Sequence, residues 1–219
     1  MKKFLSLLTL CSIFTTFSLA QEPFEGIITY KVETTLKYKG HPYNQYYSTK
    51  YGDTIKMHIH KNGSIKREYF NSGKLGLDWT IYDSIKNIEY AKWHSMDSIF
   101  FYECSEVVTE LKELKRDKDT LIQGKNCISI TAKEYEPKGK ENVIKKFYFS
   151  GDESLAPNVY SKYKDGYMDR IYNLSKSHFI RKEMDLKFTY LIFDAVEIKE
   201  QVIDLKKFEI PVGHILVDY

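Results

Sequence analysis

The chain has 219 residues and a formal net charge of only +3 at pH 7, so nothing in its charge suggests a nucleic-acid-binding protein. Its length suits one domain with a substantial core. Its 18 Tyr and 13 Phe fit half-buried strands, and an aromatic-lined cavity is the less favoured explanation of this enrichment.

The first twenty residues are typical of a signal peptide. Lys2 and Lys3 precede an apolar run diluted by Ser and Thr, and Ser18-Leu19-Ala20 supplies the small residues of a cleavage site. A membrane anchor would need roughly twenty strongly apolar residues. We therefore predict a signal peptide over residues 1–20, a single antiparallel β domain over residues 21–219, and export to the periplasm or extracellular space as a soluble chain that does not span the membrane.

The segment Phe24–Tyr38 predicts a long strand. Apolar, aromatic and β-branched residues alternate there with polar ones, which places one face in a core and the other in water. Tyr43–Tyr51 resumes a strand-like pattern after the break at Lys39–Pro42.

Residues 53–102 predict a meander of short strands. Alternating runs are separated by turn residues at spacings of about ten residues, which is typical of all-β proteins. Asn62-Gly63 is the strongest hairpin signal in the chain. The expected strands are 53–61, 64–71, 75–83, 85–93 and 99–102.

The periodicity changes after residue 104. Val107, Leu111 and Leu114 recur at helical spacing, and Ser105 suits an N-cap. We expect a short amphipathic helix over 105–116, with a strand at 107–109 as the alternative.

The remaining sequence again predicts strands. A hairpin is expected at Lys164-Asp165-Gly166, a longer irregular connection at 151–157, and closure of the domain at Phe208–Gly213. Strands are expected over 120–133, 143–150, 167–174, 178–185 and 188–201. The predicted fold class is mainly β: a large curved antiparallel sheet, as a half-barrel or open barrel, with one or two short helices. Alternation alone does not distinguish a half-barrel from a closed barrel.

Few residues carry recognisable chemistry. His58 and His60 share a strand face, but zinc needs a third ligand, such as His41 or His94, that nothing in the sequence places. Two solvent-facing histidines are the preferred interpretation. No nucleophile elbow, phosphate loop or carboxylate pair is present, so we predict no enzyme activity, no catalytic, cofactor-binding or metal-binding residue, and no cofactor.

Two cysteines lie outside the predicted leader. An oxidising compartment permits a disulfide bond between Cys104 and Cys127. Two free thiols, one or both buried, are the alternative, because sequence spacing does not place the Cα atoms.

Four segments resemble a family of secreted envelope proteins of unknown function, the GLPGLI-like domains. They are Phe24–Tyr30, Ile122–Cys127, Phe147–Ser150 and Phe208–Pro211, although Lys125 and Asn126 replace an aromatic and a basic residue of the family pattern. More distantly, the layout is similar to the lipoprotein-carrier (LolA/LolB-like) half-barrel, whose concave face is apolar. This resemblance implies binding rather than catalysis.

The expected function is therefore that of an exported, non-catalytic envelope protein that binds an apolar or amphipathic ligand, such as a lipid or acyl chain, on a concave β face. The alternative is a structural or protein-partner-binding envelope module without a small-molecule ligand. A hydrolase assembled from distant residues that include His58 and His60 is the least favoured hypothesis. No nucleic-acid partner is expected.

Overall fold

Two long strands from opposite ends of the chain form the centre of the fold. β1 (Gly26–Leu36) pairs antiparallel with β12 (Thr189–Glu200) along its whole length, with one irregularity between Thr29 and Tyr30. The computed structural model describes residues 22–41, 44–138 and 140–218. The predicted signal peptide therefore lies outside the described residues.

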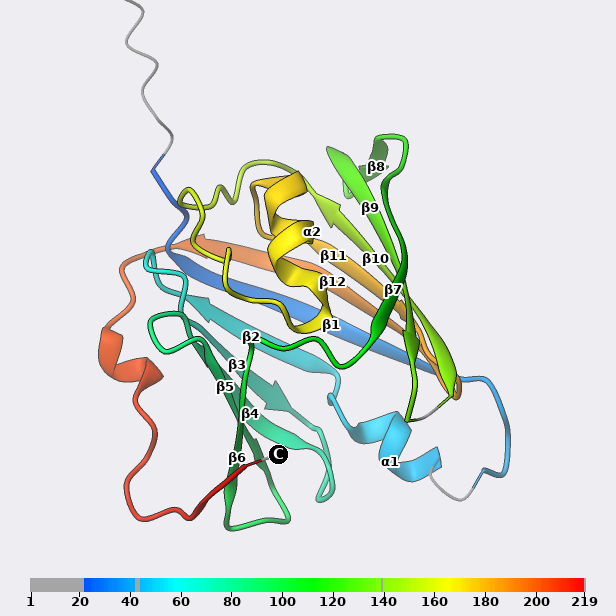
Figure 1. Ribbon diagram of the computed structural model, residues 1–219, viewed down its shortest axis with the longest axis vertical. Helices are drawn as coiled ribbons and strands as arrows, with labels where there is room; N and C mark the ends of the chain where they lie inside the picture. Colours follow the sequence, from blue (N-terminus) through cyan, green and yellow to red (C-terminus); the bar gives the residue numbers. More distant parts are fainter. Residues whose placement is uncertain (1–21, 42–43, 139, 219) are drawn as a thin grey trace, which may run out of the picture.

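The other strands extend the sheet on both sides of this pair (Figure 1). They are β2 (Thr54–Ile59), β3 (Ile65–Phe70), β4 (Leu77–Asp83), β5 (Ile88–Trp93), β6 (Ile99–Glu103), β7 (Glu110–Arg116), β8 (Thr120–Ile122), β9 (Lys125–Glu136), β10 (Glu141–Phe149), β11 (Arg181–Asp185) and β13 (Leu216–Asp218). The helical elements are α1 (Asn44–Thr49), η1 (Asp165–Tyr167), α2 (Met168–Ser175) and η2 (Leu205–Phe208).

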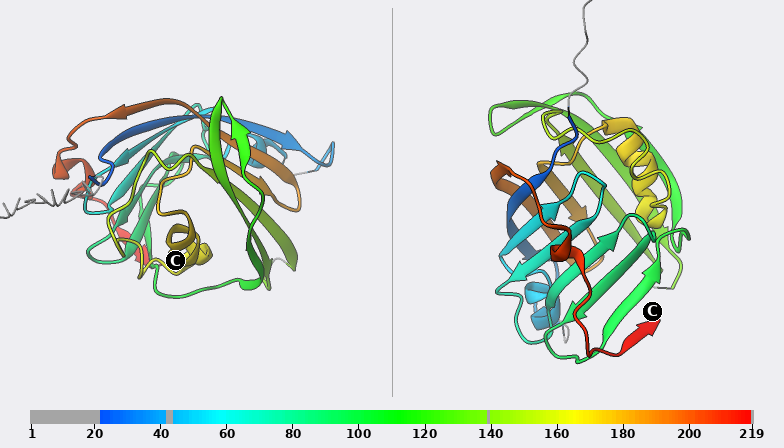
Figure 2. Two further views of the ribbon diagram at one scale, coloured as in Figure 1. Left: turned by 90° about the horizontal axis from the view of Figure 1, so that it is seen from above. Right: turned by 90° about the vertical axis from the view of Figure 1, so that its left-hand side faces the viewer.

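The described strands form one open sheet of 13 strands in the order β13-β6-β5-β4-β3-β2-β1-β12-β11-β10-β9-β7, with β8 paired to β9 outside this path. All pairs are antiparallel except β13 and β6. The sheet arches over α2 and the preceding loop, which lie on its concave side (Figure 2). This confirms the predicted large, curved, mainly β fold, in its open form.

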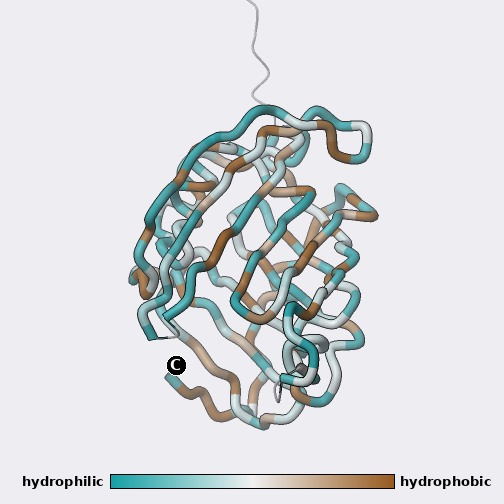
Figure 3. The backbone as a smooth tube through the Cα atoms, turned by 90° about the vertical axis from the view of Figure 1, so that its right-hand side faces the viewer, coloured by the Kyte–Doolittle hydropathy of each residue, from teal (hydrophilic) through white to brown (hydrophobic). Residues whose placement is uncertain are grey.

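Alternation along the strands places the core in the concavity. Ile28, Tyr30 and Val32 of β1 are buried, whereas Lys31 of the opposite face is exposed. The Tyr30 hydroxyl donates a 2.7 Å hydrogen bond to the carbonyl of Phe179. Hydrophilic and hydrophobic residues succeed one another along the strands in Figure 3. One face of the sheet therefore meets the core, as the sequence pattern predicts.

The predicted meander is confirmed. β2 to β6 pair consecutively, and the chain turns at Asn62-Gly63 between β2 and β3. Gly63 adopts φ +91°, a conformation that disfavours residues with a side chain.

The prediction of a strand over 43–51 is wrong, since residues 44–49 form α1; Tyr43 lies outside the described residues. The helix packs the ring of Tyr47 on that of Phe188, with 5.2 Å between the centroids. Phe188 lies in the connection between β11 and β12, far from α1 in the sequence, so the local residue pattern does not reveal this contact.

The predicted helix over 105–116 is also wrong, because residues 110–116 form the edge strand β7. The pairing of β7 with β9 shifts register between Leu111 and Glu113. A β-bulge adds one residue to a strand, so Leu111 and Leu114, three positions apart, both pack against the core. Their spacing imitates a helix. The predicted single strand over 120–133 is instead the hairpin of β8 and β9, which turns at Gln123 (φ +50°) and Gly124 (φ +78°).

The predicted strand over 167–174 is replaced by α2. Gly166 and Tyr167 both have positive φ and lead the chain into a helix instead of a hairpin. Ile171, Tyr172 and Ser175 then share one buried face at helical spacing. β13, the parallel edge strand next to β6, was not predicted.

Candidate functional site

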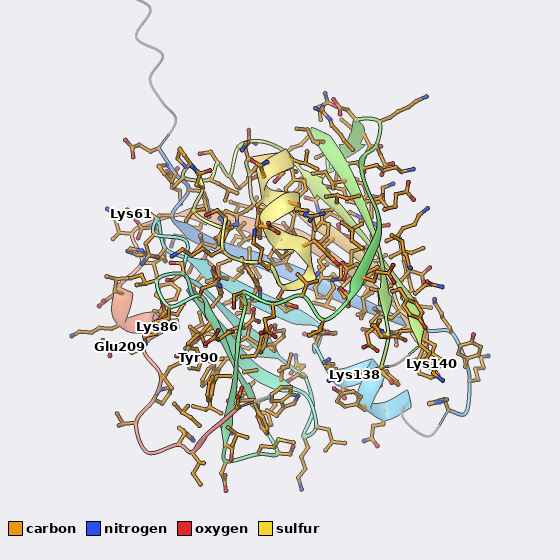
Figure 4. The ribbon with its side chains drawn as sticks, viewed as in Figure 1. Lys61, Lys86, Tyr90, Lys138, Lys140 and Glu209 are labelled. Atoms are coloured by element: carbon orange, nitrogen blue, oxygen red, sulfur yellow. The ribbon has the colours of Figure 1, made fainter. Side chains whose placement is uncertain are left out.

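A cavity of about 260 Å³ lies on the concave side of the sheet, beside η1 and the start of α2. Its apolar walls come from β2, α2, β11 and β12, and its charged groups come from β3, β5, η1, β10 and β11. In Figure 4 the labelled Lys61, Lys138 and Glu209 lie at the periphery of the molecule, away from α2. The cavity therefore combines apolar and charged walls inside the arch.

Strand geometry explains how charges enter this interior. Lys182 and Met184 are two residues apart on β11 and share its concave face. Lys182 lies in register between Phe147 of β10 and Phe193 of β12. Arg181 lies on the opposite face, and its Nη1 atom donates to both carboxylate oxygens of Asp194 at 3.0 Å.

The first charged group of the pocket is Arg67. Its Nη1 atom lies 3.6 Å from Oε1 of Glu89, and the Tyr163 hydroxyl donates a 2.6 Å hydrogen bond to Oε2 of Glu89. Burial opposes the positive charge of Arg67, but Glu89 and the surrounding tyrosines keep the pKa of its guanidinium above the ordinary value. Arg67 is therefore a half-buried cation with its own counterion.

The second group is Lys145, whose Nζ atom lies 2.8 Å from Oε1 of Glu134. The Glu134 side chain is fully buried, and its Oε2 atom also accepts a 2.9 Å hydrogen bond from the Thr109 hydroxyl. Lys145 is thus also compensated, by a carboxylate that has no access to water.

The third group, Lys182, has no such counterion among the described residues. Its Nζ atom lies 5.4 Å from the ring centroid of Phe147 and 5.7 Å from that of Phe193, distances that suit cation–π interactions. Burial, followed by the nearby charges of Lys145 and Arg67, lowers the pKa of Lys182 to about 7. Among the described residues, this half-buried ammonium without a carboxylate in ion-pair contact is the exception in the pocket.

An acid also lines the cavity. Asp165 of η1 lies 3.4 Å from the Tyr102 hydroxyl. Burial and the charge of Glu89 raise the pKa of Asp165 above its ordinary value. Its carboxylate therefore takes up a proton more readily than that of an exposed aspartate.

The space beside the pocket is filled by aromatic rings. Tyr160 stacks on Tyr172 of α2 with 4.5 Å between centroids, and His178 meets both rings edge-on at 5.9 and 5.8 Å. Burial, then the charge of Arg67, lowers the pKa of His178 to about 3. In the described structure, the two tyrosine hydroxyls and Nδ1 of His178 have no hydrogen-bond partner.

The histidines singled out by sequence do not lie at the pocket. His58 is buried, against the expectation of a solvent-facing side chain, and η2 of the C-terminal segment packs nearby against β3 and β4. Its Nε2 atom lies 2.8 Å from Oε2 of Glu68, and Oε1 of the same carboxylate pairs with Lys207 of η2. His60 lies 3.6 Å from Glu25.

The remaining metal candidates lie apart from this pair. His94 lies 2.9 Å from the hydroxyl of Ser72, and His41 packs on Phe188. Within the described ranges, no three His, Cys, Asp or Glu side chains are arranged to hold a metal ion.

The two cysteines are free, buried thiols. Burial raises the pKa of both, with Glu89 and Asp165 acting next on Cys104, whereas the backbone of Ile122 and the charge of Lys125 oppose the shift at Cys127. Their differing neighbours show that they occupy different parts of the core.

Sequence reasoning did not identify Arg67, Lys145 or Lys182, although one signal was available. Arg181-Lys182-Glu183 is a run of three charged residues on a strand between two other strands. Because side chains alternate, at least one of the three must face the interior. Consecutive charged residues on a strand inside a sheet therefore indicate that a charged side chain faces the interior.

In comparisons with known proteins, no family model matches the chain, and no curated protein matches it significantly. Among the described helices, none has the length and apolar character needed to cross a membrane. The functional argument therefore rests on the pocket itself.

Proposed function

We propose that this protein binds a small amphipathic molecule in its concave pocket and catalyses no reaction on it. The observation that carries the proposal is the cavity of about 260 Å³ in which apolar walls and a half-buried cation, with no counterion among the described residues, face the same space. Ile55 and Met57 of β2 and Phe193 of β12 supply apolar contact. A ligand with a short apolar chain and one polar end matches this division.

The size of the cavity restricts the ligand. Pockets for drug-sized molecules usually measure about 300–1,000 Å³, and this cavity lies just below that range. The stacked rings of Tyr160 and Tyr172 occupy the neighbouring space under α2. We therefore propose a short or medium-length chain, and not a long diacyl lipid held entirely inside.

Methionine methyl groups provide a direct test, because Met57, Met168 and Met184 line the cavity while Met96 is exposed elsewhere. The protein, labelled with ¹³C at its methionine methyls, is titrated with octanoate and with 1-octanol and followed by NMR. We expect the three pocket signals to shift with at least one probe and the Met96 signal to stay. Absence of shifts at all three pocket methionines with both probes would overturn the proposal.

A matched pair of variants locates the binding. Met168→Trp enlarges a half-buried side chain at the pocket and should weaken binding of the probe. Met96→Trp makes the same change at an exposed position and should leave it unchanged. Equal binding by both variants would place the probe outside the cavity.

Export is part of the proposal and rests on the sequence of residues 1–20. N-terminal sequencing of the protein from an expressing Gram-negative host should find Gln21 as the first residue, in the periplasmic or extracellular fraction. A cytoplasmic chain that retains residues 1–20 would contradict this.

A partner-binding module is the second candidate, and one observation favours it. The C-terminal segment exposes large apolar side chains: Val202 is 86% exposed, Val212 97% and Ile215 70%. Such residues can serve as contacts for another protein. Co-purification of one defined envelope protein, lost in a Val212→Asp/Ile215→Asp variant, together with a pocket that binds neither probe, would favour this function.

A further inference from the structure

We propose that the pocket selects a ligand with a single negative charge, a carboxylate, and that the ammonium group of Lys182 binds it. This inference rests on the proposed function, since it assigns the polar end of the same amphipathic ligand. It follows from how the charges of the pocket are paired.

Two of the three interior cations are already neutralised by the protein. Arg67 faces Glu89, and Lys145 forms an ion pair with the fully buried Glu134. Lys182 remains, with phenylalanine rings on its neighbouring strands and no carboxylate in ion-pair contact among the described residues. An anion in the pocket would therefore find one uncommitted cation.

Withdrawing a cation from water, even in part, is energetically unfavourable when no counterion is present. An apolar residue in place of Lys182 would avoid this cost, and it would pack readily beside Phe147 and Phe193 on the neighbouring strands. A lysine whose charge is left uncompensated in a cavity is a candidate for a functional group. A ligand carboxylate would supply the missing negative charge and accept hydrogen bonds from the ammonium.

The charges around Lys182 favour a monoanion over a phosphate dianion. A second negative charge would need a second uncommitted cation, but Arg67 of β3 and Lys145 of β10 each already face a carboxylate. Glu89 of β5 and Asp165 of η1 also line the cavity and would repel excess negative charge. One ammonium therefore matches one carboxylate.

This arrangement predicts pH-dependent selectivity. Burial opposes the protonation of Lys182 most strongly, and the charges of Lys145 and Arg67 oppose it further. Glu134 and Glu89 favour protonation, and the combined effect is a pKa of about 7. A carboxylate ligand stays ionised through this range. Its affinity should therefore fall as pH rises above about 7, when Lys182 loses its proton.

The test compares octanoate with 1-octanol, which differ in the charged group. Affinities are measured by calorimetric titration at about pH 6 and about pH 9, on either side of the Lys182 pKa of about 7. We expect octanoate to bind about tenfold more tightly than 1-octanol at the lower pH, the size of one charged hydrogen-bonded contact, and this preference to shrink at the higher pH.

Three variants separate charge from shape. Lys182→Met should lose the preference for octanoate and keep 1-octanol binding. Lys182→Arg, which stays charged at both pH values, should keep the preference and lose its pH dependence. Lys199→Met removes an exposed lysine of β12 and should behave like the unmodified protein.

The outcomes distinguish this inference from the function on which it rests. Equal binding of octanoate and 1-octanol by the unmodified protein at the lower pH, or an unchanged preference in Lys182→Met, would overturn the role of Lys182 while leaving the pocket proposal intact. Binding of neither probe would overturn both. If Lys182→Met does not fold, the pH profile of the unmodified protein beside that of Lys182→Arg decides the question.

Discussion

Two neighbouring regions under the same arched sheet are filled in different ways. Under α2, Tyr160, Tyr172 and His178 pack their rings against one another on the concave side of the sheet. Beside the start of α2, Arg67 and Lys182 line an open space of about 260 Å³. The sheet is common to both regions, so the difference comes from what covers it.

The comparison shows that curvature alone does not make a binding site. A curved sheet of 13 strands would expose a long apolar trough, but α2 and its preceding loop close one part with aromatic rings. The remaining part keeps charges that would be unfavourable in a packed core. The filled region therefore serves stability, and the open region is the place to look for function. The following predictions test this division.

The largest effect is expected from breaking the buried ion pair of the open region. Lys145→Met leaves the carboxylate of Glu134, which is fully buried, without its counterion. Removing one partner of a buried pair typically costs about 3–5 kcal/mol. Urea denaturation should show a loss of this size. Lys31→Met, which breaks the exposed Lys31–Glu33 pair, is the control and should leave the free energy of unfolding unchanged within error.

A cavity created by mutation in the filled region should strongly reduce the free energy of unfolding. Ile171 of α2 is fully buried, and Ile171→Ala should reduce the free energy of unfolding by about 2–5 kcal/mol. Leu174→Ala on the same helix is a matched control, because Leu174 is 46% exposed. Equal losses in the two variants would show that α2 does not pack on the core as described.

Lys182 should give the open region a characteristic pH dependence of stability. Its pKa of about 7 in the folded protein lies below the ordinary value of 10.5, so the unfolded chain binds this proton more tightly. The resulting destabilisation is complete below about pH 7 and disappears as pH rises towards 10.5. Lys182→Met should therefore be more stable than the unmodified protein near pH 7, by a margin that narrows at pH 9. A margin independent of pH would contradict this assignment.

A smaller effect is expected at acid pH from His178 in the filled region. Its pKa of about 3 lies below the ordinary 6.5, so folding is disfavoured increasingly as pH falls from 6.5 towards 3. His178→Leu replaces the titratable imidazole with an apolar side chain among the rings. The variant should therefore lose less stability than the unmodified protein as the pH falls from 6.5 towards 3. Acid titrations followed by circular dichroism compare the two proteins, and parallel curves would exclude His178 as a source of acid sensitivity.

Much of the sheet could be predicted from local alternation. The pattern of Phe24–Tyr38 identified the buried face of β1, and Asn62-Gly63 located a hairpin. The pattern failed where distant strands decided the local structure. Leu111 and Leu114 have helical spacing, but a register shift against β9 places both on the core side of a strand.

The pocket was less predictable than the sheet. Arg67 lies opposite Glu89 although 22 positions separate them in the chain, and Lys145 meets Glu134 across a strand pair. Sequence reasoning instead selected His58 and His60, which lie on the outer face under the C-terminal segment. Charged side chains occur on both faces of these strands, so residue type alone does not tell which charged residues face the concavity.

By itself, the sequence determined that the chain forms long, half-buried strands in an antiparallel sheet, because side chains at alternate positions must face opposite sides. Only the tertiary structure decided that residues 168–175 form a helix inside the arch, and that Lys182 faces the cavity with no counterion among the described residues. The physical reason is that alternation is a local property, whereas the filling of a concave space and the pairing of charges depend on residues that folding brings together from distant parts of the chain.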